Sequence, residues 1–228
     1  MELNVDFSQR AVMHAASIGW IPSPIAGVDR RMLDRIGDEV ARATSIVRYA
    51  PNSRFTPHTH GGGEEFLVLD GVFQDERGSF AAGSYIRNPP QSRHTPGSTP
   101  GCVIFVKLWQ FDAADRTQVH LDTNALPFTP DADRPGVAVK RLFEDSREQV
   151  RLEQWAPGAR VTLPDLPGGA EILVLDGSFS ERGERFTQLS WLRLPKGAAL
   201  EAHAGGAGCR IWLKIGHLSV LPTGPADG

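Results

Sequence analysis

The sequence predicts an all-β protein built from two tandem barrels. Short apolar runs, frequent turn residues and an internal repeat support this class. The 228 residues include 24 Gly and 17 Pro, the residue types that most often end a strand or helix. Apolar runs of three to six residues between such positions are typical of strands in a sandwich or barrel. They cover residues 44–49, 66–69, 103–106, 150–152, 172–175 and 211–213.

The two halves of the chain repeat each other. Residues 50–54 (APNSR) correspond to 156–160 (APGAR), and residues 65–73 (EFLVLDGVF) to 171–179 (EILVLDGSF). Both matches have the same offset, since 156 − 50 and 171 − 65 are both 106. A fixed period of this size indicates a duplicated domain. We expect a first domain at 1–115, a second at 116–222 and a tail at 223–228, with the leading segment belonging to the first barrel.

Local patterns add two expectations about elements within the halves. One short helix is expected around Arg30 to Glu39. The pairs Asp70-Gly71 and Asp176-Gly177 are expected to form turns between strands, because Asp-Gly is frequent in tight turns. Features that both halves keep are interpreted as scaffold, which includes Lys107 with Lys214 and the cysteines Cys102 and Cys209, packed as small apolar residues.

Four side chains in the first half have the spacing of a metal site. His58 and His60 alternate along an extended segment, so both point to one face. Glu64 follows a glycine-rich bend and can return an oxygen from the next strand, and His94 follows a proline-rich turn. Three nitrogens and one carboxylate oxygen suit Zn, Fe, Mn or Ni. We predict one divalent metal ion per chain.

The second half has lost all four of these positions. Pro164, Leu166, Ala170 and Leu200 stand where the first half has His58, His60, Glu64 and His94. Because the four positions change together while the surrounding scaffold persists, they behave as one functional unit. Glu65 recurs as Glu171 and is therefore interpreted as structural.

These motifs resemble the cupin superfamily, whose first motif is G-x5-H-x-H-x3,4-E-x6-G and whose second is G-x5-P-x-G-x2-H-x3-N. The ligand spacings match, while Asn52, Gln91 and Ser98 depart from the glycine, glycine and asparagine of the motifs. The departures affect loop geometry rather than ligand identity. The resemblance implies a double-stranded β-helix, or jelly-roll, barrel in each half, and thus a bicupin.

A narrower resemblance is to the cupin domain of ChrR-type anti-sigma factors, strong over about residues 20–112 and weak in the second repeat. It is carried by residues 42–45, 48–51, 58–60, 63–73, 87–90 and 94–98. It implies a metal site, most often zinc, and a regulatory or stress-sensing role with a small-molecule ligand and a sigma factor or other regulatory protein as partners. The helical zinc-binding domain that grips the sigma factor in those regulators has no counterpart in this sequence.

Two other functions stay open. Small cupins that resemble this chain include acetylacetone dioxygenase and related oxygenases, in which histidine-bound Fe(II) leaves positions for O2 and substrate. The sequence is therefore also compatible with a dioxygenase acting on a small ketone or diketone. A third interpretation is a purely structural metal in a binding module. Cupins often pair, so a homodimer is a further alternative.

Composition excludes several classes of partner. The net charge of −3 and the pI of about 6.2 give no electrostatic reason to expect nucleic acid or an acidic membrane. No apolar run approaches the roughly 20 residues of a membrane span, and no signal peptide is recognisable. Two cysteines are too few for a disulfide framework. A cytoplasmic location is expected.

The other polar and aromatic candidates receive ordinary interpretations. Arg48, Arg87 and Arg93 either orient an anionic ligand or form surface ion pairs. Tyr85 and Trp109 are expected to be core aromatics. The remaining histidines are interpreted as surface or core residues, namely His14, His120, His203 and His217.

Overall fold

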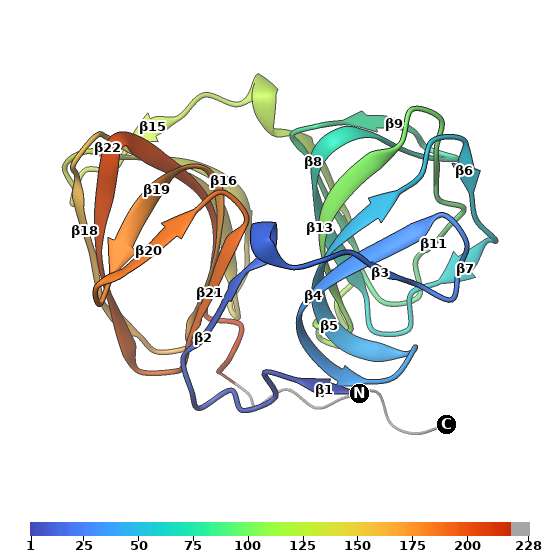
Figure 1. Cartoon of the computed structure of the whole chain (residues 1–228), viewed down its shortest axis with the longest axis horizontal. Helices are drawn as coiled ribbons and strands as arrows, with labels where there is room; N and C mark the ends of the chain where they lie inside the picture. Colours follow the sequence, from blue (N-terminus) through green and yellow to red (C-terminus); the bar gives the residue numbers. More distant parts are fainter. Residues whose placement is uncertain (220–228) are drawn as a thin grey trace. The chain divides into compact units, whose positions relative to one another are not determined.

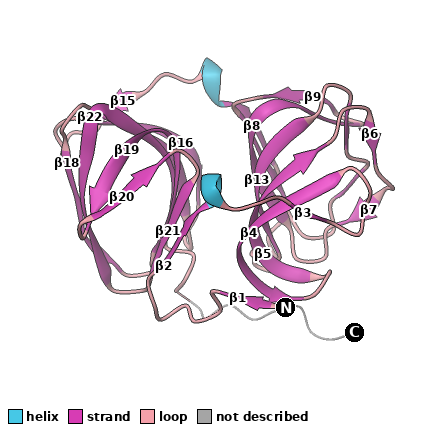
Figure 2. Ribbon diagram, in the orientation of Figure 1, coloured by secondary structure: helices cyan, strands magenta, loops and turns pink. Residues whose placement is uncertain are grey.

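The computed structural model of this chain describes residues 1–219 and confirms the all-β class. Its strands form two compact β-barrel units (Figure 1). The helical elements within residues 1–219 are two short 3-10 turns, η1 (Ala15–Ser17) and η2 (Thr123–Ala125) (Figure 2). In this part of the chain no helix is long and apolar enough to cross a membrane. The expected tail at 223–228 lies outside the described residues.

The first barrel consists of a main sheet and a small ribbon. Its central strand order is β1-β4-β5-β13-β8-β10-β14, with β3, β6, β9 and β12 paired at the sides and β7 paired with β11. The strands are β1 (Glu2–Leu3), β3 (Ile21–Pro22), β4 (Val28–Gly37), β5 (Ala41–Tyr49), β6 (Ser53–Arg54), β7 (His58–Thr59), β8 (Glu64–Asp75), β9 (Gly78–Ala81), β10 (Ser84–Asn88), β11 (Arg93–His94), β12 (Gly97–Ser98), β13 (Cys102–Leu108) and β14 (Val119–Asp122).

The second barrel has the corresponding order β15-β16-β17-β22-β19-β21-β2, with β18 and β20 at the sides. The strands are β2 (Ala11–His14), β15 (Thr129–Pro130), β16 (Val137–Glu144), β17 (Gln149–Trp155), β18 (Arg160–Leu166), β19 (Ala170–Glu181), β20 (Glu184–Thr187), β21 (Ser190–Leu194) and β22 (Ala198–Ile215). The matching orders confirm the duplication inferred from the sequence.

One strand near the start of each repeat, β2 in the first and β14 in the second, belongs to the other barrel. Strand β2 pairs with β21, where Met13 faces Trp191, and β14 pairs with β10, where Ile86 faces His120. The segment Asp6–Ile18 is therefore part of the second unit, and residues 116–125 are part of the first. This differs from a simple boundary after residue 115. The exchanged strands cover edges that would otherwise expose unpaired backbone groups.

Two local expectations from the sequence are wrong. The segment around Arg30 to Glu39 is not a helix but the strand β4 and the start of the following hairpin, because its backbone is paired with β5 along its length. Tertiary pairing here overrides the local helical pattern. Arg30 and Glu39 lie in this extended hairpin and contact each other at 3.4 Å.

The Asp-Gly pairs bend strands rather than end them. Gly71 lies inside β8 and Gly177 inside β19, with φ of +69° and +71°, where the ladders shift register. A Cβ atom on Gly71 would lie 2.1 Å from the carbonyl oxygen of Gly101. Glycine is required there because the backbone is left-handed and another strand passes close by.

Each barrel encloses its own apolar core. Phe66, Val68, Phe73 and Ile104 lie in the core of the first barrel, together with Cys102. The second core is more extensive and includes Cys209. Both thiols are buried, as expected from the sequence, and burial raises their pKa to about 11 for Cys102 and about 12 for Cys209.

Candidate metal centre

Two short strands bring the three predicted histidines together. His58 of β7 faces His94 of β11 directly across the ladder. The ladder continues past β7, because the N–H of His60 donates to the carbonyl of Ser92 at 2.9 Å and the N–H of Gln91 donates to the carbonyl of His60 at 2.8 Å. The three imidazole centroids lie 4.6–5.1 Å apart. This confirms that the histidines form one cluster.

Glu64 reaches the same cluster from the first residue of β8. Its Oε2 lies 3.3 Å from Nε2 of His60 and 3.6 Å from Nε2 of His94. Nε2 of His94 in turn lies 3.3 Å from Nε2 of His58. One carboxylate oxygen and three imidazole nitrogens therefore face a common point. We call these four residues the His–Glu cluster.

Contacts at the far side of the His60 and His58 rings indicate their tautomers. Ser92 Oγ donates to the carbonyl of Pro89 at 2.6 Å, so it accepts from Nδ1 of His60 at 2.9 Å. The Nδ1 of His58 lies 3.3 Å from the carbonyl of Thr56, which can only accept. With the proton on Nδ1, each Nε2 carries a lone pair directed into the cluster, as metal binding requires.

The donor set fits a metal ion. Ligand atoms of His58, His60 and His94 lie within 4.8 Å of one another, so the three histidines can hold an ion. The Nε2 of His60 is buried and has no hydrogen-bond partner within the described residues. Such a buried polar atom is costly unless something binds it, and a divalent ion at the common point would do so. His58 is exposed, so this side of the cluster is accessible.

Electrostatics keeps the donors in the forms that bind cations. Burial alone would raise the pKa of Glu64, but its close contacts with His60 and His94 and the hydrogen bond from Asn88 lower it to about 2. Burial is the main cause that lowers the pKa of His94, partly offset by the carboxylate of Glu64. At neutral pH the cluster thus offers an ionised carboxylate and a neutral imidazole.

A second layer of side chains holds Glu64 and His94. Asn88 Nδ2 donates to Oε2 of Glu64 at 3.1 Å, and Gln118 Nε2 donates to Oδ1 of Asn88 at 3.2 Å. Asp75 Oδ2 lies 3.5 Å from Nδ1 of His94. Sequence reasoning missed Asn88, Gln118 and Asp75. Gln118 could not have been predicted from the sequence. It belongs to the second repeat, directly before the strand β14 that joins the first barrel.

The equivalent region of the second barrel is apolar. Leu166, Ala170 and Leu200 are 3%, 1% and 0% exposed and belong to the core, whereas Pro164 is exposed at the end of β18. Side chains without lone pairs fill the volume that the His–Glu cluster occupies in the first barrel. The predicted contrast between the halves is confirmed for these positions.

Trp109 is not the core residue expected from the sequence. It is 36% exposed and adopts a left-handed backbone with φ of +59°. Its ring covers the glycine bend between His60 and Glu64, because a Cβ on Gly62 would lie 2.5 Å from the indole. The N–H of Trp109 also donates to the carbonyl of Gly63 at 3.1 Å. Trp109 thus packs directly on the bend that joins two members of the cluster.

The other candidates have structural roles. Arg48 pairs with Asp29 at 2.7 Å and Arg87 with Asp115 at 2.7 Å, whereas Arg93 is exposed. Tyr85 is buried and donates to Glu65 at 2.6 Å. The scaffold lysines are both buried. The remaining histidines lie outside the cluster and contact Glu184 (His14), Phe80 (His120) and Glu171 (His217), while His203 is an exposed residue of β22.

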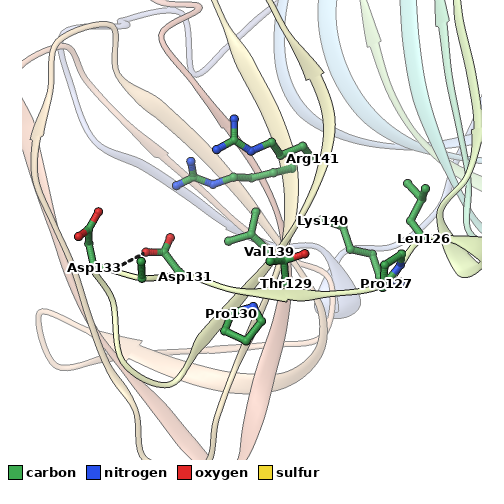
Figure 3. Close-up of a pocket in the computed structure, with 11 residues that line it drawn as sticks. Leu126, Pro127, Thr129, Pro130, Asp131, Asp133, Val139, Lys140 and Arg141 are labelled. Atoms are coloured by element: carbon green, nitrogen blue, oxygen red, sulfur yellow. Dashed lines mark hydrogen bonds between the residues drawn. The ribbon is translucent and has the colours of Figure 1, made fainter.

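An open cleft of about 570 Å³ lies on the second barrel, lined by Leu126, Pro130, Lys140 and Arg141 among others (Figure 3). Its charged side chains are largely neutralised by neighbours. Asp131 pairs with Arg134, and Arg141 pairs with Glu144. The cleft therefore offers few charges to a ligand.

Comparison with known proteins identifies the family. The model of the ChrR Cupin-like domain matches residues 8–112 and again residues 116–219. The chain belongs to the ChrR Cupin-like domain family. Each matched repeat begins just before one of the exchanged strands, β2 or β14. Each cupin repeat is therefore continuous in the sequence, whereas each barrel contains a strand from the other repeat. No curated protein matches the chain in sequence at a significant level.

Solved structures confirm the cupin fold. A "putative dioxygenase" from Nostoc punctiforme aligns with a TM-score of 0.77 and 18% identity, covering 97% of this chain and 87% of that one. Ylba from Escherichia coli gives a TM-score of 0.70 and 16% identity, with coverage of 95% and 94%. The nickel(II) complex of the pirin YhhW from Escherichia coli gives 0.64 and 16%, with coverage of 91% and 98%. At these identities the similarity shows that this ChrR-like bicupin shares its fold with those proteins.

Proposed function

We propose that the first barrel binds one divalent metal ion through His58, His60, Glu64 and His94, and that the protein is a regulatory or stress-sensing cupin. The observation that carries the metal site is the convergence of three Nε2 atoms and Oε2 of Glu64, with the buried Nε2 of His60 lacking a hydrogen-bond partner among residues 1–219. Three nitrogens and one oxygen suit tetrahedral zinc. Membership of the ChrR Cupin-like family supports the regulatory role.

In this role the metal centre binds a small molecule and the protein signals to a partner, such as a sigma factor or another transcription protein.

Metal analysis of protein purified without chelators or a metal column is the first test, and one zinc per chain is expected. His60→Ala is the matched variant and should contain no zinc. Pull-down from the native cells should recover a regulatory protein with the metal-loaded chain, whereas recovery of the chain alone would contradict the regulatory role.

A second candidate function is a non-haem Fe(II) dioxygenase acting on a small ketone or diketone. The exposure of His58 favours it, because an octahedral ion held by four protein ligands keeps two positions for other molecules. The Nostoc punctiforme neighbour described as a dioxygenase is consistent with this chemistry on the same fold. Protein loaded anaerobically with Fe(II) should then consume O2 with a β-diketone, and His58→Ala should not. Absence of turnover across a panel of ketones would argue against this candidate.

A further inference from the structure

Two arginines of β4 lie on the face that lines the first barrel. Arg30 faces Val47 across the ladder, and Val47 belongs to the interior core. Directly paired residues of neighbouring strands project from the same face of a sheet. Val28, two residues before Arg30, also packs on this core. The side chain of Arg30 therefore projects to the inside of the barrel.

Arg35 lies in the same cross-strand row as Glu64. Beyond a register shift in β4, Arg35 faces Ala43 of β5, Ala43 faces Leu108 of β13, and Leu108 faces Glu64 of β8. Leu108 packs on the interior core, which fixes the orientation of the row. Arg35 and the metal-facing carboxylate are thus on the same inner face of one sheet.

Both guanidinium groups lack strong partners. Nε of Arg30 is buried without a hydrogen bond within residues 1–219, and its two terminal nitrogens reach the exposed Glu39 only at 3.4 Å. Arg35 is 4% exposed, and its Nε donates to the carbonyl of Gly37 at 3.2 Å. Burial and the nearby charge of Arg30 lower the pKa of Arg35, and the carboxylates of Glu39 and Asp38 offset this only in part. Both carboxylates lie on the exposed hairpin, so an anion inside the barrel would pair with the buried guanidinium groups more closely.

The second barrel has neither arginine. Val139 occupies the position of Arg30, because it faces Glu153, the counterpart of Val47. Glu144 occupies the position of Arg35, because it faces Gln149, the counterpart of Ala43. The two barrels therefore differ at both positions, and the inner-face arginines of the second barrel, Arg141 and Arg151, lie in the row between them.

We propose that Arg30 and Arg35 form an anion-binding subsite that holds a carboxylate of a small dicarboxylic acid, whose other carboxylate binds the metal of the His–Glu cluster. The metal-binding half of this statement rests on the proposed function. Guanidinium groups bind carboxylates through paired charge-assisted hydrogen bonds.

The test uses the full chain loaded with Co(II), whose visible absorption reports changes at the metal. Malonate, succinate and glutarate are titrated, with succinamide as the uncharged counterpart of succinate. At least one dicarboxylate should change the cobalt spectrum at concentrations where succinamide does not. Arg30→Gln and Arg35→Gln should each weaken its binding about tenfold, the usual effect of losing a charge-assisted hydrogen bond. Cobalt affinity itself should change less than twofold.

Arg48→Gln is the matched control. Arg48 lies between Val47 and Tyr49 on β5, so its side chain projects from the opposite face of the same sheet. This variant should bind the dicarboxylate as the unmodified protein does. Equal binding by all variants, or no dicarboxylate binding, would overturn the proposal.

Calorimetry on the metal-free protein separates the two claims. If cobalt does not bind, the proposed metal function fails, but succinate binding that depends on Arg30 and Arg35 would still support the subsite. If cobalt binds and neither arginine affects any dicarboxylate, the subsite fails and the metal function stands. Circular dichroism of each variant verifies that the fold is retained.

Discussion

Asn88 donates a hydrogen bond of 3.1 Å from its Nδ2 to Oε2 of Glu64, the oxygen that faces His60 and His94. Asn88 faces Glu64 across the β10–β8 ladder and is itself held by Gln118. A chain of two hydrogen bonds, from Gln118 to Asn88 and from Asn88 to Glu64, therefore holds the carboxylate. This relationship gives the first prediction.

Replacing Asn88 by alanine should weaken metal binding without removing any ligand. Removal of such an orienting partner typically costs about 10–100-fold in metal affinity. Competition with a chromogenic chelator measures the dissociation constant. Gln118→Ala, one step further from the ligand, should have a smaller effect in the same direction. An unchanged affinity of Asn88→Ala would show that this hydrogen bond does not orient Glu64.

Equivalent substitutions in the two barrels should have opposite consequences. His60→Ala should abolish metal binding, because the first barrel is the one with the donors. Leu166→Ala, at the matching position of the second barrel, should leave the metal content unchanged but lower the free energy of unfolding by about 2–5 kcal/mol, as is usual for a buried leucine. Elemental analysis and urea unfolding measure the two quantities. Loss of metal in Leu166→Ala would contradict the assignment.

The exchange of strands predicts which fragments fold. A fragment of residues 19–125 keeps β14, which pairs with β10 over four residues, but lacks β1, which pairs with β4 over two. A fragment of residues 1–115 keeps β1 but lacks β14 and leaves β10 as an open edge. We expect residues 19–125 to resist proteolysis longer and to unfold at a higher temperature, although the second fragment follows the repeat boundary. Equal or greater stability of residues 1–115 would mean that β14 is dispensable.

The Arg87–Asp115 pair predicts a pH-dependent contribution to stability. Burial would raise the pKa of Asp115, but hydrogen bonds from Thr117 and Arg87 outweigh burial. The pKa of Asp115 therefore lies below its ordinary value. A carboxyl whose pKa is lowered in the folded state stabilises the fold above its unfolded pKa of about 3.9 and loses this contribution as the pH falls through the folded value. Asp115→Asn should therefore cost about 1–3 kcal/mol at pH 7.

That difference should shrink as the pH falls below about 4, where the carboxyl of the unmodified protein begins to be protonated. Urea unfolding of the metal-free protein between pH 3 and pH 7 measures it. A difference that stays constant over this range would mean that the charge of Asp115 is not what stabilises the pair.

The internal repeat made much of the fold and cluster predictable. Comparison of His60 with Leu166, or of Glu64 with Ala170, separates functional from scaffold positions within one sequence. The fold class followed from short strands and frequent turn residues. These features are visible because they are local or recur at a constant offset.

Features that depend on contacts between distant segments were not predictable. The segment of β4 has a helix-like local pattern, and its pairing with β5 decides its structure. Gly71 belongs to a turn-type pair, yet it lies inside β8 next to a register shift, where the backbone of Gly101 passes close by. Trp109 likewise packs on the glycine bend between His60 and Glu64, which is distant from it in the sequence. No pattern around Met13 or His120 indicates that their strands join the other barrel.

Gln118 precedes a strand that the second repeat contributes to the first barrel, so the barrel with the His–Glu cluster is not encoded by one contiguous half of the chain. Deletion of the second repeat would therefore remove an edge strand from the barrel that holds the cluster, and deletion of the first repeat would do the same to the second barrel.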